Sequence, residues 1–171
     1  MTATETTYEI MTRYFAAEKS ESLLFIGVGI IALILAVVLW RGSGAIRGMA
    51  IPLAAVALIQ LTVGATVYLR TDGQVATLAQ QLKQAPDAFK RAETTRMRRV
   101  MTSFQWYKAL EVGLILLGLA SAILRRPPSL AFGIGVGLVL QAGLMLALDF
   151  PAEHRGQEYL RHVQTMPIPG L

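Results

Sequence analysis

The sequence predicts an all-α integral membrane protein, a four-helix bundle of spanning helices. Three observations favour this fold class. Of the 171 residues, 54% are hydrophobic and 16% are charged, and the mean hydropathy of +0.50 is too high for an ordinary soluble domain. Four runs without charge approach the roughly 20 residues that a spanning helix needs. Short basic segments separate the members of each pair of runs and mark the turns.

The first two spans lie between Glu21 and Arg41 and between Arg47 and Arg70, where no Asp, Glu, Lys, Arg or His occurs. An acidic, aromatic segment precedes the first span, and no small-residue cleavage site ends it before "WRG". The first span therefore lacks the features of a cleavable signal peptide, and we expect it to remain in the mature protein.

The third and fourth spans are residues 112–124 and 129–148, which are likewise uncharged. The segment "RRPPS" separates them, and its two consecutive prolines forbid one continuous helix and force a tight reversal. Apolar positions at helical spacing flank the spans on their polar sides. We expect these flanks to form short amphipathic interfacial helices, the first of the second pair beginning at Pro86.

Two segments of the chain resemble each other, because "MTRYFAAEKSE" (residues 11–21) returns as "MTSFQWYKALE" (residues 101–111). The second spans match as well, with Gln60 aligned on Gln141. We therefore predict a single membrane domain (residues 1–171) built from two tandem repeats of a helical hairpin, at about 6–84 and 87–165. Each unit holds two spans, so the repeats are parallel and related by an axis along the membrane normal.

The topology rule gives a divided answer on orientation. The two predicted tips hold four arginines, Arg41, Arg47, Arg125 and Arg126, and the opposite side holds the other Lys and Arg residues with all 11 acidic ones. The count of Lys and Arg favours cytoplasmic termini, whereas the absence of acids in the tips favours the reverse. We expect a multi-pass protein of a bacterial inner membrane with its termini in the cytoplasm.

Polar residues inside the spans are the first candidates for a binding site, because the membrane makes them costly. Gln60 and Gln141 each lie about half-way along a span. Buried glutamines often serve packing alone, and the alternative is a ligand contact on the repeat axis. Glu111 is closer to its tip than Glu21 is, so we expect Glu111 inside the membrane and directed into the bundle. It is either neutralised by Lys108, one turn away, or available to a proton or cation.

A second set of candidates stands at one membrane edge, which we predict to be the polar mouth of the bundle. It comprises Glu21, Arg70, Asp72, Glu111, Asp149, Glu153 and His154. His154, Glu158 and His162 share one helical face, but the absence of a metalloprotease motif and the nearby arginines favour a solvated face over a metal site. We expect no metal and no cofactor.

The basic run "KRAETTRMRR" precedes the third span and carries Lys90, Arg91, Arg96, Arg98 and Arg99. We predict that these side chains bind anionic lipid headgroups rather than nucleic acid, since the run lies beside a bilayer and contains no recognised nucleic-acid motif. Small-residue tracts such as "GIGVG" favour close helix packing, within one chain or between copies. Further copies of the chain or a larger membrane complex are therefore expected partners.

The sequence excludes several classes of function. With no cysteine, the chain forms no disulfide and has no thiolate nucleophile. It contains no nucleotide-binding loop, catalytic-triad spacing or haem motif. We expect a non-enzymatic protein that binds or passes a small polar or amphiphilic molecule through the mouth and the central glutamines. An accessory subunit and a membrane enzyme using the mouth carboxylates are the alternatives, and catalytic residues are unknown.

Overall fold

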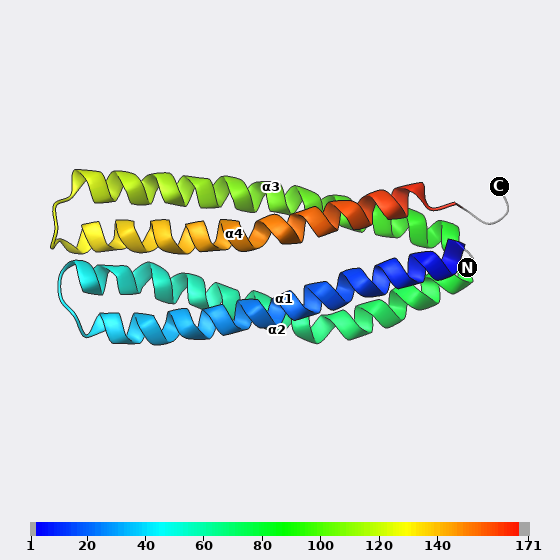
Figure 1. Ribbon diagram of the computed structural model, residues 1–171, viewed down its shortest axis with the longest axis horizontal. Coiled ribbons are helices and arrows are strands. Elements are labelled where there is room, and N and C mark those ends of the chain that lie inside the picture. The colour runs from blue at the N-terminus through cyan, green and yellow to red at the C-terminus, as the bar shows by residue number, and fades with distance from the viewer. Residues whose placement is uncertain (1–2, 168–171) are drawn as a thin grey trace.

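The computed structural model describes residues 3–167, and this part of the chain is helical apart from short connections. Its four helices are α1 (Ala3–Trp40), α2 (Ala45–Gln84), α3 (Pro86–Leu124) and α4 (Leu130–Thr165). They run along the whole length of an elongated bundle (Figure 1). Each contains a segment long and apolar enough to cross a membrane. The four predicted spans are confirmed, and the chain is a multi-pass integral membrane protein.

The turns lie where the sequence predicts them. The turns at residues 41–44 and 125–129 share one end of the bundle, and the start of α1 and the end of α4 lie at the opposite end with the α2–α3 connection (Figure 1). Pro86 occupies the first turn of α3, and the Ser129 hydroxyl caps α4 by accepting a hydrogen bond from Phe132 N. Gly44 has φ 52°, and a side chain there would strike the Pro128 carbonyl. The two tips therefore touch.

All four helices are about twice as long as the hydrocarbon core of a bilayer is thick. They contain 36 to 40 residues, or roughly 55–60 Å at 1.5 Å per residue, against a hydrocarbon core of about 30 Å. We call residues 22–68 and 106–150 the tip half, and residues 3–21, 69–105 and 151–167 the terminal half. Each helix contributes about 20 residues, or about 30 Å, to the tip half.

The terminal half has a core of large side chains from all four helices. It contains Met11 and Phe15 of α1, Leu78 and Leu82 of α2, Phe89 and Met97 of α3, and Tyr159, Val163 and Met166 next to them. The amphipathic flanks predicted as separate short helices are continuous with the spans. Gly73 lies within α2 and Pro151 within α4, and neither interrupts its helix. The apolar faces of the flanks are buried against one another in this core.

The tip half is held together mainly by small residues. Gly133 and Gly137 of α4 contact the backbone of α2 near Ala45 and Met49. A methyl group on Gly118 of α3 would lie 2.6 Å from the carbonyl oxygen of Gly135 of α4. The "GIGVG" tract therefore packs within one chain, and it brings α4 close to α2 on one side and to α3 on the other.

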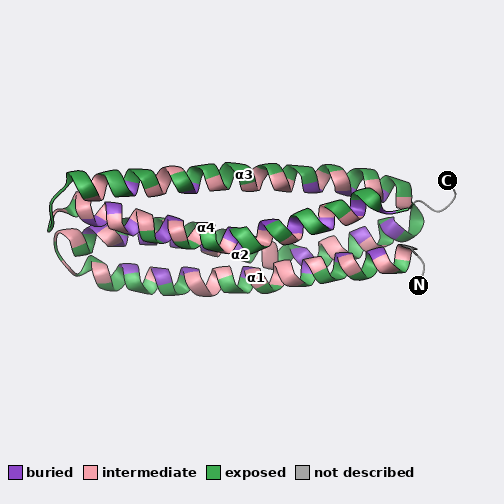
Figure 2. Ribbon diagram, turned by 45° about the horizontal axis from the view of Figure 1, so that its top comes forward, coloured by how far each residue is buried: buried purple, intermediate pink, exposed green. Residues whose placement is uncertain are grey.

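The hairpins α1–α2 and α3–α4 meet mainly through α2 and α4. The outer helix α3 is largely exposed along its length (Figure 2). Only 11% of its most apolar segment is buried, against 33% for α2. The apolar segment of α1 is 22% buried, so in the tip half both α1 and α3 have broad exposed faces.

Candidate functional site

The two predicted central glutamines bond to each other. Gln141 Nε2 donates to Gln60 Oε1 at 3.1 Å, and Gln60 Nε2 contacts Met145 Sδ at 3.0 Å. Both side chains are buried, Gln60 completely. Other side chains of the protein therefore satisfy much of the hydrogen-bonding capacity of these two amides. This geometry agrees with the packing interpretation of the pair, since each amide stabilises the contact between α2 and α4.

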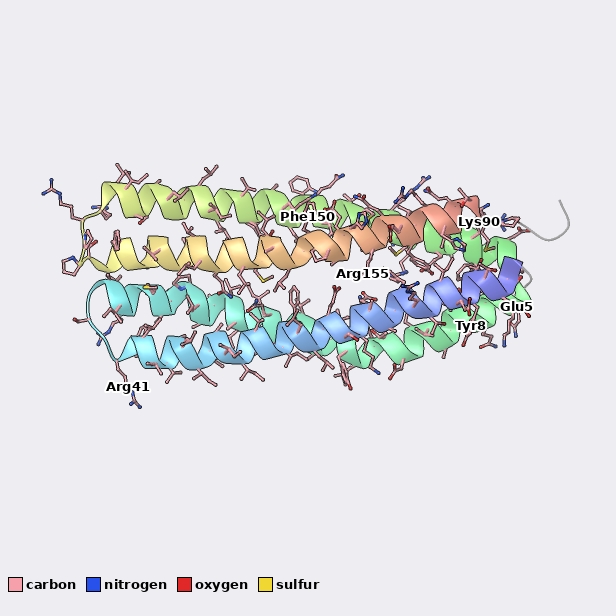
Figure 3. All side chains as sticks on the ribbon, in the orientation of Figure 1. Glu5, Tyr8, Arg41, Lys90, Phe150 and Arg155 are labelled. Carbon is pink, nitrogen blue, oxygen red and sulfur yellow. The ribbon has the colours of Figure 1, made fainter. Side chains whose placement is uncertain are left out.

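Ion pairs between helices mark the boundary of the two halves. They join Lys19 to Asp72 (2.6 Å), Arg70 to Glu18 (3.5 Å), Lys108 to Glu153 (2.7 Å) and Arg155 to Glu21. Arg155 lies between α4 and α1, far from Arg41 at one end and Lys90 at the other (Figure 3). The predicted mouth residues Glu21 and Arg70 are thus engaged with partners on neighbouring helices.

Glu111 differs from these carboxylates because it has no such partner. Its side chain is 6% exposed, and Oε2 makes no hydrogen bond to any residue that the structure describes. Asp149 of α4, which is 8% exposed, is close enough to interact electrostatically with it. The predicted direction of Glu111, into the bundle and toward span four, agrees with this arrangement.

The proposed local pair of Lys108 with Glu111 is wrong. Lys108 Nζ instead bonds both carboxylate oxygens of Glu153, at 2.9 and 2.7 Å. Glu153 lies on α4, so the ammonium links two helices rather than two turns of α3. The ammonium of Lys108 is thus held by a charge-assisted contact across the α3–α4 interface, and Glu111 Oε2 is without a donor in the described part of the chain.

His154 does not join the mouth. It lies on the exposed side of α4 and pairs with Glu158 at 3.3 Å, with both side chains more than half exposed. His162 faces Thr7 of α1 at 3.2 Å instead. Within residues 3–167, no group of three or more His, Cys, Asp or Glu side chains is arranged to hold a metal ion.

The basic run before span three divides into inward and outward side chains. Arg96 bonds Glu93 at 2.7 and 2.8 Å and lies over the Phe15 ring, while Lys90 donates to the Met166 carbonyl at 2.8 Å. The other three arginines, Arg91, Arg98 and Arg99, are exposed. The predicted headgroup set is thus reduced to these three outward residues.

A buried polar network in the terminal half was not predicted. Glu93 is 1% exposed and accepts hydrogen bonds from Arg96 and from the Tyr159 hydroxyl at 3.0 Å. Tyr159 also stacks on Tyr14 with ring centroids 4.5 Å apart. The spacing of Phe89, Glu93 and Met97 at every fourth residue is a signal that places Glu93 on the buried face of α3.

No family model, curated protein or solved structure matches the chain. The interpretation of the mouth therefore rests on its own geometry and charge.

Proposed function

We propose that the chain is a membrane protein that binds the positively charged part of a small polar or amphiphilic molecule at the mouth formed by Glu111, Asp149, Glu153 and Lys108. In this proposal the tip half lies in the bilayer, and the terminal half projects from one face of it. The observation that carries the proposal is the buried Oε2 of Glu111, which lacks a hydrogen-bond donor within the described part of the chain.

The charge of the mouth supports a cationic ligand. Asp149 interacts electrostatically with Glu111 on one side and with Glu153 and Lys108 on the other, so this row of three carboxyl groups contains one ammonium, which is paired with Glu153. Apart from the tip arginines, Lys108, Glu111 and Asp149 are the only charged residues of the tip half. A buried carboxylate without a donor is costly. An ammonium group from a ligand supplies both the missing donor and the missing positive charge.

Binding fits the structure better than passage does. The ligand path toward the membrane centre would run along α4 from Asp149 to Gln141, but Met145 lies between them and contacts Gln60. The glutamines are bonded to each other. We therefore propose that the ligand stops at the mouth and that its apolar part remains beside the helices in the lipid.

The tandem duplication is part of the proposal. Lys19 pairs with Asp72 between α1 and α2, and Lys108 pairs with Glu153 between α3 and α4. Asp72 and Glu153 are 81 positions apart, the same offset as Gln60 and Gln141, and the two lysines are 89 positions apart. Gly29 and Gly118, also 89 apart, each approach the partner helix of their own hairpin. These contacts favour an offset of 89 residues between α1 and α3, whereas the alignment of residues 11–21 with residues 101–111 has an offset of 90.

Glu111 tests the proposal by substitution. The purified protein in a neutral detergent is heated with octylammonium or, as a ligand of equal chain length without charge, octanol. We expect octylammonium to raise the melting temperature and octanol to have little effect. Glu111→Gln keeps the shape of the side chain but removes its charge. The variant should therefore need an octylammonium concentration about tenfold higher or more for the same rise in melting temperature.

Glu158→Gln is the control, because it makes the same change at a carboxylate that lies in the terminal half outside the mouth, is exposed and pairs with His154. It should retain the octylammonium response. An equal response in the Glu111→Gln protein, or an equal effect of octanol, would contradict a cation site. The alternative of an accessory subunit, supported by the bonded glutamines and the unburied faces of α1 and α3, would then be favoured.

A further inference from the structure

The outer face of α3 carries positive charge without counter-charge. Arg91, Arg98 and Arg99 are exposed, and in the described part of the chain their guanidinium groups have no hydrogen-bond or ion-pair partner, whereas their carbonyls accept from Thr95, Thr102 and Ser103. Two adjoining shallow depressions lie on this face, and each is lined by side chains of α3 alone. Thr95 and Arg99 line both, Arg91 lines the first, and Arg98 and Thr102 line the second. Such a surface attracts an anion.

The basic face continues into an apolar one. Arg99 and Trp106 are seven residues apart, so they lie on the same side of α3, about 10 Å from each other along its axis. Trp106 is 72% exposed, and Leu110 and Leu117 beyond it are 61% and 64% exposed. From the terminal half toward the tip, this side of α3 therefore changes from arginine to tryptophan to leucine.

We propose that an anionic membrane lipid lies along this face, with its phosphate at Arg98 and Arg99 and an acyl chain against Leu110 and Leu117. Trp106 marks the interface between headgroups and hydrocarbon, where tryptophan is enriched. The headgroup layer extends roughly 5–8 Å beyond the hydrocarbon, and an arginine side chain spans the remaining distance.

The position of Arg91 makes the proposal specific. Its Cα lies 15 residues before Trp106, or about 22 Å along the helix, which is beyond the headgroup layer. Arg91 carries the same charge and is exposed like Arg98 and Arg99. An acidic protein would bind all three arginines, whereas a lipid binds only the two near the bilayer. The continuity of the two arginines with the exposed leucines favours the lipid.

Fluorescence quenching of Trp106 tests the site. The chain has two tryptophans, so Trp40→Phe leaves Trp106 as the only one. This protein is reconstituted in phosphatidylcholine vesicles that contain a fixed fraction of brominated phosphatidylglycerol or of brominated phosphatidylcholine. From the quenching we expect brominated phosphatidylglycerol to be enriched about fivefold next to Trp106, relative to brominated phosphatidylcholine at the same total fraction. This enrichment should be smaller at high salt.

The arginine variants are made in the same background. Arg98→Gln with Arg99→Gln should remove the excess quenching, and Arg91→Gln should retain it. Quenching by brominated phosphatidylcholine serves as the internal measure that Trp106 still lies at the bilayer in each variant. Equal quenching by the two brominated lipids, or an excess that survives the double substitution, would overturn the proposal. A loss in Arg91→Gln as large as in the double variant would also overturn it. None of these results depends on the mouth around Glu111.

Discussion

The two halves of the molecule use the same four helices but pack them differently. In the terminal half the buried side chains are large, among them Phe15, Phe89, Met97 and Tyr159. In the tip half they are mostly small, such as Ala50, Ala57 and Ala142, together with close-packed glycines. In water, burial of large apolar side chains drives packing. In lipid that driving force is absent, and close backbone approach replaces it. The difference supports the proposal that the tip half lies in lipid and the terminal half in water.

The ion pairs at the boundary fit this division. Glu21 with Arg155 and Lys108 with Glu153 join helices at the level where the packing changes. Beyond these pairs, toward the tips, the first hairpin contains no charge until its tip arginines, whereas the second contains Glu111 and Asp149. The two hairpins are therefore alike in packing and unlike in charge, which assigns the mouth to α3 and α4.

The largest effect is expected from a core aromatic of the terminal half. Phe89 is completely buried, and Phe89→Ala should lower the free energy of unfolding by about 3–5 kcal/mol. Phe150→Ala makes the same change at a tip-half side chain that is 71% exposed, and its cost should be about 1 kcal/mol or less. Denaturant unfolding of the full chain in mixed micelles measures both. Similar losses for the two variants would break the comparison between the halves.

The next effect concerns close backbone contacts in the tip half. A methyl group on Gly133 would overlap the Ala45 carbonyl, whereas one on Gly143 of the same helix would meet no atom within 4 Å. Gly133→Ala should cost about 1–3 kcal/mol through overpacking. Gly143→Ala should be neutral or stabilising by about 0.5–1 kcal/mol, because alanine favours helix. The same unfolding assay decides, and destabilisation by Gly143→Ala would reveal a contact on its open side.

The smallest effect is expected at the centre of the membrane. Gln141→Leu removes the bond to Gln60, and such bonds contribute about 0.6 kcal/mol on average. Combining it with Gln60→Leu in a double-mutant cycle isolates the pair, and the coupling energy should be of this order. A much larger coupling, or a loss of octylammonium binding with an intact fold, would mean that the pair does more than pack.

The sequence predicted the spans and turns because these depend on local information. The gap in charge from Glu21 to Arg41 and the prolines of "RRPPS" act within a few residues. The amphipathic flanks could not be placed in the same way. A stripe such as Val75, Leu78 and Leu82 has the same spacing whether it faces a bilayer surface or three other helices. Only the presence of matching stripes on all four helices distinguishes a continuous bundle from interfacial helices.

The partners of charged residues were the hardest to predict. Lys108 and Glu111 are local neighbours by spacing, yet Lys108 bonds Glu153, 45 residues further along the chain. Arg96 belongs to a basic run that predicts an exposed surface. Its position around α3, however, places it beside Glu93 and Met97 on the buried side of the helix. Depth was predictable for Glu111 because distance to a tip can be counted. The choice among several possible partners depends on how neighbouring helices are aligned.

The unbroken passage of all four helices from one half to the other has a mechanical consequence. Because the helices are continuous, a change in the tilt of the tip half also changes the orientation of the terminal half. At the average tilt of spanning helices, about 20°, the far end of a segment about 30 Å long moves about 10 Å sideways. If the tip half lies in the bilayer as proposed, a change in bilayer thickness that alters its tilt displaces the far ends of α1 and α4 sideways, and the level of the Glu21–Arg155 pair is the pivot.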